Sequence, residues 1–257
     1  MQIDPRRHLD IEGTHNVRDL GGYETENGKR TQWRRFLRAD SLSGLSDASR
    51  QALVDLGLRT VVDLRRGSEL EAAPSALADS TELAYHHLDM IGEDPLEPFP
   101  APVVEGADNR YAKRVATSYC LWLDRRQPSV RQILGVLAAP DALPALFNCA
   151  AGKDRTGCIS ALLLGLAGVP EEVVAADYAL SARFRVAVYL EELASRGERR
   201  EGYTWEDFRD EFVPAEAMSL VLRHLQQQYG GVEAYVRAIG IESAQVDSLR
   251  AGLLDGD

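Results

Sequence analysis

The chain is short of cysteine and has no long apolar stretch. Three cysteines, Cys120, Cys149 and Cys158, occur in 257 residues, an odd number without metal-ligand spacing. Such usage is typical of a reduced intracellular protein rather than a disulfide-bonded secreted one. No run of about twenty apolar residues occurs, so we expect no stable membrane insertion. Residues 1–7 lack the apolar core of a secretory signal. We therefore expect a cytoplasmic protein, although export without such a signal stays open.

Positively charged residues are also fewer than negatively charged ones. The 29 lysines and arginines against 40 aspartates and glutamates give a net charge of −11. There is no basic run and no basic patch interleaved with aromatic residues, so nucleic acid is not an expected partner. The five histidines show no helical ligand spacing, and the adjacent His86 and His87 would face opposite sides of a strand. We therefore expect no metal and no other cofactor.

One ten-residue segment, Asn148–Gly157, carries most of the chemical information. It reads Asn-Cys-Ala-Ala-Gly-Lys-Asp-Arg-Thr-Gly. Apolar residues 143–147 precede it and an apolar stretch over 159–169 follows it. The pattern predicts a buried strand, a tight turn and a helix. A cysteine stands at one end of the turn and an arginine at the other, with five residues between them.

Such a turn is suited to binding a phosphate group. A phosphate monoester carries about two negative charges and presents three terminal acceptor oxygens. Backbone N–H groups curled around one centre, together with those of a helix start, can satisfy these oxygens. Gly152 adds backbone conformations that other residues rarely adopt, and Arg155 can add a bidentate fork. We expect the phosphate to be bound by Ala150, Ala151, Gly152, Lys153 and Arg155.

Cys149 is then placed to act as a nucleophile. A lone cysteine that ends a buried strand is more often an inert core residue. The surrounding Cys-x2-Gly-x2-Arg-Thr-Gly spacing, which arises by chance in roughly one or two of ten thousand such sequences, favours the functional interpretation. We expect Thr156 to donate its hydroxyl to the sulfur and ease its departure. The reaction these parts fit is attack by sulfur, followed by hydrolysis of the phosphoenzyme.

The segment resembles the signature of cysteine-dependent phosphatases. Residues 151–157 are similar to the loop of the bacterial atypical tyrosine/dual-specificity and phosphoinositide phosphatase family. The similarity spans about residues 9–241. Further segments that resemble the family are Asn16–Tyr23, Phe36–Asp40, Val61–Arg65, Asp177–Ser181 and Gly230–Tyr235. The resemblance implies a phosphoric monoester hydrolase that acts on phosphotyrosine proteins, and in some members on phosphoserine, phosphothreonine or phosphoinositides.

The organisation of the chain agrees with an α/β domain. We expect one domain over 1–257, with a mostly parallel sheet flanked by helices and a helical C-terminal half. Strands are expected at 36–38, 59–64, 83–88 and 145–148, and an irregular acidic loop at 92–109. Helices are expected at 47–56, 110–126, 129–138, 155–167, 183–195, 205–212, 215–229 and 232–238, and another from Pro170. The resemblance implies that 181–213 forms a helical lid, and the alternative is that these helices simply pack on the domain.

Three carboxylates are candidates for the general acid that protonates the leaving oxygen. The resemblance points to Asp154, inside the loop. Asp89 is the second candidate, because many dual-specificity phosphatases place their acid on a loop after this strand, and Asp63 is the third. Each could instead order a loop or pair with an arginine. We favour Asp154, so the expected catalytic set is Cys149, Arg155 and Asp154.

Asn148 and Lys153, which neighbour the expected catalytic residues, affect the activity and the substrates that we expect. Most cysteine phosphatases have a histidine before the nucleophile, where this chain has Asn148, which carries no charge in any state. We expect an active enzyme whose cysteine ionises less readily than with histidine there. Lys153 is one of three lysines in the chain. Its ammonium could contact a second phosphate, as on an inositol headgroup, or simply be solvated.

Two other functions are alternatives to phosphatase activity. A catalytically weak relative could bind phosphorylated ligands without turning them over, which Asn148 makes conceivable. A different thiolate enzyme, such as a rhodanese or an arsenate reductase, could use a related loop. The Arg-Thr pair at 155–156 and the remaining family pattern argue against the latter.

Overall fold

The computed structural model describes residues 4–94 and 109–254. Its centre is a five-stranded sheet in the order β1-β2-β5-β3-β4. Neighbouring strands are parallel except β1, which pairs antiparallel with β2 at one edge. The strands are β1 (Arg18–Asp19), β2 (Phe36–Ala39), β3 (Thr60–Asp63), β4 (Ala84–His87) and β5 (Ala145–Asn148). The expected α/β fold with a mostly parallel sheet flanked by helices is confirmed.

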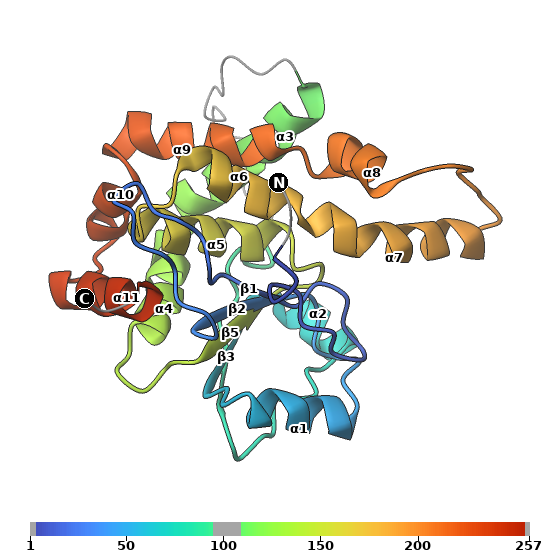
Figure 1. The fold of residues 1–257 in the computed structure, drawn as a ribbon, viewed down its shortest axis with the longest axis horizontal. Coiled ribbons are helices and arrows are strands. Elements are labelled where there is room, and N and C mark those ends of the chain that lie inside the picture. Colours follow the sequence, from blue (N-terminus) through green and yellow to red (C-terminus); the bar gives the residue numbers. More distant parts are fainter. Residues whose placement is uncertain (1–3, 95–108, 255–257) are drawn as a thin grey trace.

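Helices cover both faces of the sheet (Figure 1). Helix α1 lies on one face, where Leu53 packs with Leu37, Val61 and Leu146. On the other face, Phe36, Val62 and Phe147 pack with the residues of the larger helical layer. The helices are α1 (Asp47–Asp55), α2 (Gly67–Ala72), α3 (Arg110–Arg125), α4 (Gln127–Leu137), α5 (Asp154–Leu166), α6 (Glu171–Ala179), α7 (Ser181–Ser195), α8 (Trp205–Phe212), α9 (Ala215–Tyr229), α10 (Val232–Ala238) and α11 (Ser243–Leu253).

Strand β5 occupies the middle of the sheet, between β2 and β3, and all four of its residues are buried. Helix α5, which follows it, is buried along nearly its whole length. Ligands in open parallel sheets bind outside the carboxyl ends of the strands. The loop between β5 and α5 therefore lies where such a fold commonly places a site.

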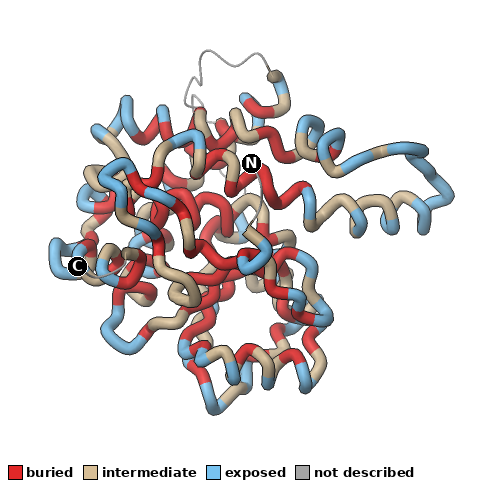
Figure 2. The backbone as a smooth tube through the Cα atoms, viewed as in Figure 1, coloured by how far each residue is buried: buried red, intermediate tan, exposed pale blue. Residues whose placement is uncertain are grey.

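Helices α7 and α8 form a hairpin that projects from the body of the molecule, with an exposed outer end (Figures 1 and 2). The two helices are held together by an aromatic cluster. The Tyr189 ring lies 5.1 Å from that of Phe208 and 5.3 Å from that of Phe212. Both helices agree with the expected ranges within two residues.

Two helices have no counterpart among the elements expected from the sequence. Helix α2 has six residues, none of them buried, so it offers no apolar periodicity to detect. Helix α11 buries Val246, Leu249 and Leu253 against the core. Most of the acidic loop expected over 92–109 lies outside the described residues.

Candidate active site

The loop from Cys149 to Lys153 turns tightly against the end of β2. Gly152 has φ +63°, and a Cβ atom there would lie 2.7 Å from the carbonyl oxygen of Ala39. Only glycine combines this backbone conformation with so close an approach. Cys149 is 1% exposed, at the base of the turn. The strand, tight turn and helix expected from the sequence are therefore confirmed.

Helix α5 begins at Asp154, so Arg155 stands in its first turn. The first backbone N–H groups of a helix have no partner within it and carry partial positive charge. The start of α5 therefore directly follows the loop, and its N–H groups would favour an anion bound there.

The Arg155 guanidinium is already bound in the structure. It donates to both carboxylate oxygens of Glu69, at 2.5 and 2.8 Å. The hydrogen bonds from Arg155 lower the pKa of Glu69 to about 2, so Glu69 is ionised near neutral pH. Glu69 lies on α2 and also accepts from the backbone N–H of Arg66. The pair orients the guanidinium before any ligand arrives.

Sequence reasoning missed Glu69. It lies 86 residues before its partner, on a short exposed helix. The sequence does carry one signal at this residue, because a glutamate at the third position of a helix commonly accepts a hydrogen bond from its N-cap backbone. That signal predicts a helix start but says nothing about the distant arginine.

Asp154 accepts a hydrogen bond from the phenol of Tyr119, which also lies 2.9 Å from the Tyr178 hydroxyl. Burial and the charge of Asp154 raise the pKa of Tyr119 well above its ordinary value, so the phenol stays protonated and donates. The Asp154 side chain is 31% exposed. It is thus held in place on one side and open to solvent on the other.

The other two acid candidates are engaged elsewhere. Asp63 is buried, and both of its oxygens accept from the Arg65 guanidinium, at 2.8 to 3.1 Å. Asp89 accepts from the backbone N–H groups of Ile91 and Gly92, at 2.9 and 2.8 Å. These are the arginine-pairing and loop-ordering roles weighed in the sequence analysis.

Two side-chain expectations need correction. Lys153 is not a freely solvated rim residue: its ammonium donates to the carbonyl oxygen of Phe212 at 3.3 Å and lies 3.4 Å from Asp154 Oδ1. The Thr156 hydroxyl donates to the carbonyl oxygen of Ala39 at 3.5 Å rather than to the Cys149 sulfur. Both side chains bond to backbone carbonyl oxygens of segments far away in the sequence, which tertiary packing brings next to the loop.

Asn148, immediately before Cys149, is fully buried, and neither its amide nitrogen nor its amide oxygen has a hydrogen-bond partner. It is paired in register with Ala39 and Asp63. Because side chains alternate along a strand, Asn148 points to the same face as Leu146, towards α1. The position therefore has polar groups but no fixed charge of its own.

We expect Asn148→His to move the acidic limb of the kcat/KM–pH profile to lower pH. An imidazolium beside the nucleophile would favour the thiolate electrostatically, which a neutral amide cannot do. The profile is measured with para-nitrophenyl phosphate. Asn148→Gln is the matched control, because it keeps the amide and adds only one methylene. An unchanged acidic limb in the histidine variant would contradict the idea.

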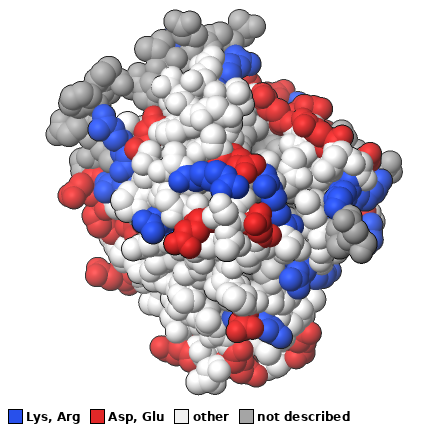
Figure 3. All heavy atoms as spheres, turned by 90° about the vertical axis from the view of Figure 1, so that its left-hand side faces the viewer, with Lys and Arg blue, Asp and Glu red and all other residues white. Residues whose placement is uncertain are grey.

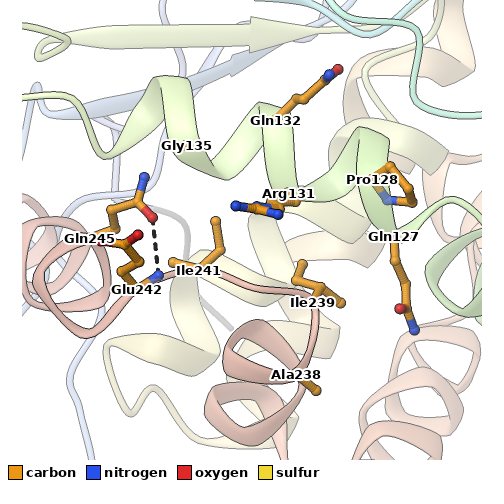
Figure 4. Close-up of a pocket in the computed structure, with 10 residues that line it drawn as sticks. All are labelled: Gln127, Pro128, Arg131, Gln132, Gly135, Ala238, Ile239, Ile241, Glu242 and Gln245. Carbon is orange, nitrogen blue, oxygen red and sulfur yellow. Dashed lines mark hydrogen bonds between the residues drawn. The ribbon is translucent and has the colours of Figure 1, made fainter.

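A surface hollow of about 710 Å³ lies away from this loop, between α4 and the α10–α11 segment (Figure 4). In it the Gln245 side chain accepts from the backbone N–H of Glu242 at 3.0 Å, which caps α11. The molecular face that carries α10 and α11 shows acidic and basic side chains intermixed (Figure 3). No residue of the β5–α5 loop lines this hollow.

Within the part of the chain that the structure describes, no helix is both long enough and apolar enough to cross a membrane. All three cysteines are free and buried. Cys158 is packed inside α5.

Comparison with known proteins agrees with this geometry. A profile described as "Tyrosine phosphatase family" matches residues 9–255. A tyrosine-protein phosphatase of Nostoc commune is 32% identical over 227 residues, covering 85% of this chain and 74% of the relative. The triple specificity protein phosphatase PtpB of Mycobacterium tuberculosis is 27% identical over a 280-residue alignment, covering 95% of this chain and 98% of the relative. The chain therefore belongs to the tyrosine phosphatase family.

Proposed function

We propose that the protein hydrolyses phosphoric monoesters of proteins, phosphotyrosine above all, through a phosphocysteine intermediate on Cys149. One observation carries the proposal: the cysteine lies at the base of a loop whose far end presents Arg155, already oriented by two hydrogen bonds to Glu69. A dianionic phosphate fits this site because the guanidinium fork and the open helix N–H groups converge there.

In the proposed reaction the Cys149 thiolate attacks phosphorus, and an S–P bond forms as the P–O bond to the leaving group breaks. Asp154 gives its proton to the leaving oxygen. A water molecule then attacks the phosphocysteine, the S–P bond breaks, and the water's proton returns to Asp154. Arg155 and the loop N–H groups stabilise the charge on the transferred oxygens in both steps. The products are the dephosphorylated hydroxyl and inorganic phosphate.

Asp154 is the best placed of the three acids. Its side chain is partly exposed beside Arg155, whereas Asp63 is in a buried ion pair and Asp89 orders its own loop. Tyr119 donates to one oxygen of Asp154 and so orients the carboxyl group without blocking the other oxygen. An acid needs this combination of fixed orientation and access to the substrate.

The proposed substrate range extends beyond phosphotyrosine. One relative is named a triple specificity protein phosphatase, which favours phosphoserine and phosphothreonine besides phosphotyrosine. Phosphoinositide hydrolysis is part of the proposal, with Lys153 as the contact to a second phosphate. Since Lys153 bonds to Phe212 in the substrate-free structure, it would have to leave that carbonyl first.

A turnover panel on one preparation tests the proposal: para-nitrophenyl phosphate, phosphotyrosine, phosphoserine and phosphothreonine peptides, and soluble phosphoinositides, assayed by phosphate release. Hydrolysis of the aryl and phosphotyrosine substrates is the expected result. Binding of phosphorylated ligands without phosphate release would favour the alternative, a binding module, for which the uncharged Asn148 is the supporting observation.

We further propose that the α7–α8 hairpin, within 181–213, acts as a lid. The Lys153–Phe212 hydrogen bond ties the phosphate loop to the end of α8, so ligand binding and hairpin position are linked. Closure would exclude water from the thiolate. Bound vanadate is expected to slow proteolysis in the exposed connection over 196–203. Cleavage at an unchanged rate would mean that these helices simply pack on the domain.

A further inference from the structure

Three successive carbonyl groups of the phosphate loop point outward and are hydrogen-bonded there. The Ala150 oxygen accepts from the backbone N–H of Ser41 at 3.2 Å. The Ala151 and Gly152 oxygens each accept from the side-chain amide of Asn16 at 3.1 Å. The Gly152 oxygen also accepts from Arg38 at 2.8 Å. All of these donors lie outside the loop.

The direction of a carbonyl group decides where the next N–H group points. In a planar trans peptide the C=O and the following N–H are antiparallel. Carbonyls of residues 150–152 that face outward therefore aim the N–H groups of residues 151–153 at the loop's centre. Those N–H groups are the donors that a bound phosphate needs.

The two side chains that hold the carbonyls are themselves held in a buried cluster. Arg38 donates to Asp177 Oδ2 at 2.5 Å with one nitrogen while the other reaches Gly152. Arg18 donates to the Asn16 side-chain oxygen and, at 3.0 Å, to the Asp177 carbonyl. All four side chains are almost fully buried. The cluster thus joins β1, β2 and α6 to the loop.

Its charges are unbalanced. Among these four side chains two guanidinium groups face the one carboxylate of Asp177, while the buried Asp40 carboxylate accepts from the backbone N–H of Asn16 at 3.0 Å. Burial and the neighbouring Arg38 lower the pKa of Arg18 to about 9, which still leaves it charged at neutral pH. Burial raises the pKa of Asp177, but the charges of Arg38 and Arg18 outweigh burial and lower it. Holding such a cluster out of water is costly.

We propose that Asn16 and Arg38 are positioning residues of the phosphate loop, holding its carbonyls outward and so aiming its N–H groups at the substrate, with Arg18 and Asp177 holding the two in place. The proposal rests on the proposed function, since it states how this chain builds the phosphate site. None of the four side chains needs to touch substrate.

Asn16→Ala is the direct test, with Arg38→Lys as a second variant that can keep the ion pair but cannot span both Asp177 and Gly152. In each, kcat/KM for para-nitrophenyl phosphate and the affinity for vanadate should fall together, by about ten- to a hundredfold. We expect kcat to fall more than KM rises, because a misaimed N–H group costs most in the transition state.

Tyr235→Phe is the matched control. It removes a buried hydrogen bond, from the Tyr235 hydroxyl to the carbonyl oxygen of Leu123 at 2.8 Å, which joins α10 to α3 and involves no residue of the loop. It should lower the melting temperature while kcat and vanadate affinity stay at wild-type values. A lower melting temperature with unchanged kcat and vanadate affinity in both Asn16→Ala and Arg38→Lys would overturn the proposal. Should Asn16→Ala fail to fold, the Arg38→Lys result decides.

Measuring vanadate binding by calorimetry distinguishes a failure of this inference from a failure of the proposed function. If the wild type turns nothing over yet binds vanadate, the phosphatase proposal fails while the positioning proposal is still tested by the affinity of Asn16→Ala. A wild type that turns over substrate, with variants that match it in both measurements, would overturn the positioning proposal alone.

Discussion

Cys149→Ser is expected to lower turnover of para-nitrophenyl phosphate by on the order of 10⁴-fold or more. The substitution exchanges one atom and leaves the turn's shape unchanged, but a serine hydroxyl does not ionise near neutral pH. In the proposed mechanism the nucleophile is the Cys149 thiolate, which a serine cannot supply. The variant should still bind vanadate or phosphate, because the loop N–H groups and the guanidinium remain.

The control for this variant is Cys158→Ala. Cys158 is equally buried, nine residues further along, but it packs inside α5 rather than at the base of the loop. Its loss should leave kcat within a few-fold of wild type.

Acid quenching of the wild type during turnover, followed by peptide mass spectrometry, should find phosphate on Cys149. A serine variant that retains a tenth of wild-type activity, or a phosphoenzyme at another residue, would refute the mechanism.

Asp154→Asn is expected to lower kcat by about 10²- to 10³-fold for phosphotyrosine, whose phenoxide leaves poorly without a proton. The loss should be much smaller for para-nitrophenyl phosphate, because its phenolate is a stable leaving group. Asparagine keeps an oxygen that can accept from Tyr119, so the side chain's orientation is preserved.

Asp89→Asn is the matched control, since its oxygen can still accept from the Ile91 and Gly92 N–H groups. It should leave both substrates unaffected. The assignment is wrong if Asp89→Asn, and not Asp154→Asn, makes turnover depend steeply on the leaving group. The comparison of two substrates guards against a folding defect, because a partly unfolded enzyme loses activity on both equally.

Much of the phosphate loop was predictable because its signals are local. An apolar strand, a glycine at positive φ and a helix start follow one another within about twenty residues, and each depends on its own neighbours. Helices α7 and α8 were predictable for the same reason, whereas their projection from the body of the molecule was not. The six-residue α2 was not, because an exposed helix that buries none of its residues lacks a hydrophobic pattern.

The sequence by itself determined the spacing of Cys149 and Arg155 and the α/β order of the elements around them. Tertiary structure alone decided which hydrogen-bond partners the loop residues have. These pairs are Arg155 with Glu69, Asp154 with Tyr119, Lys153 with Phe212, and the loop carbonyls with Asn16 and Arg38. These contacts join residues 35 to 136 positions apart. In a chain with 29 basic and 40 acidic residues, charge alone cannot select among so many pairs. Only packing brings the chosen groups within reach and removes the water that would otherwise compete for them.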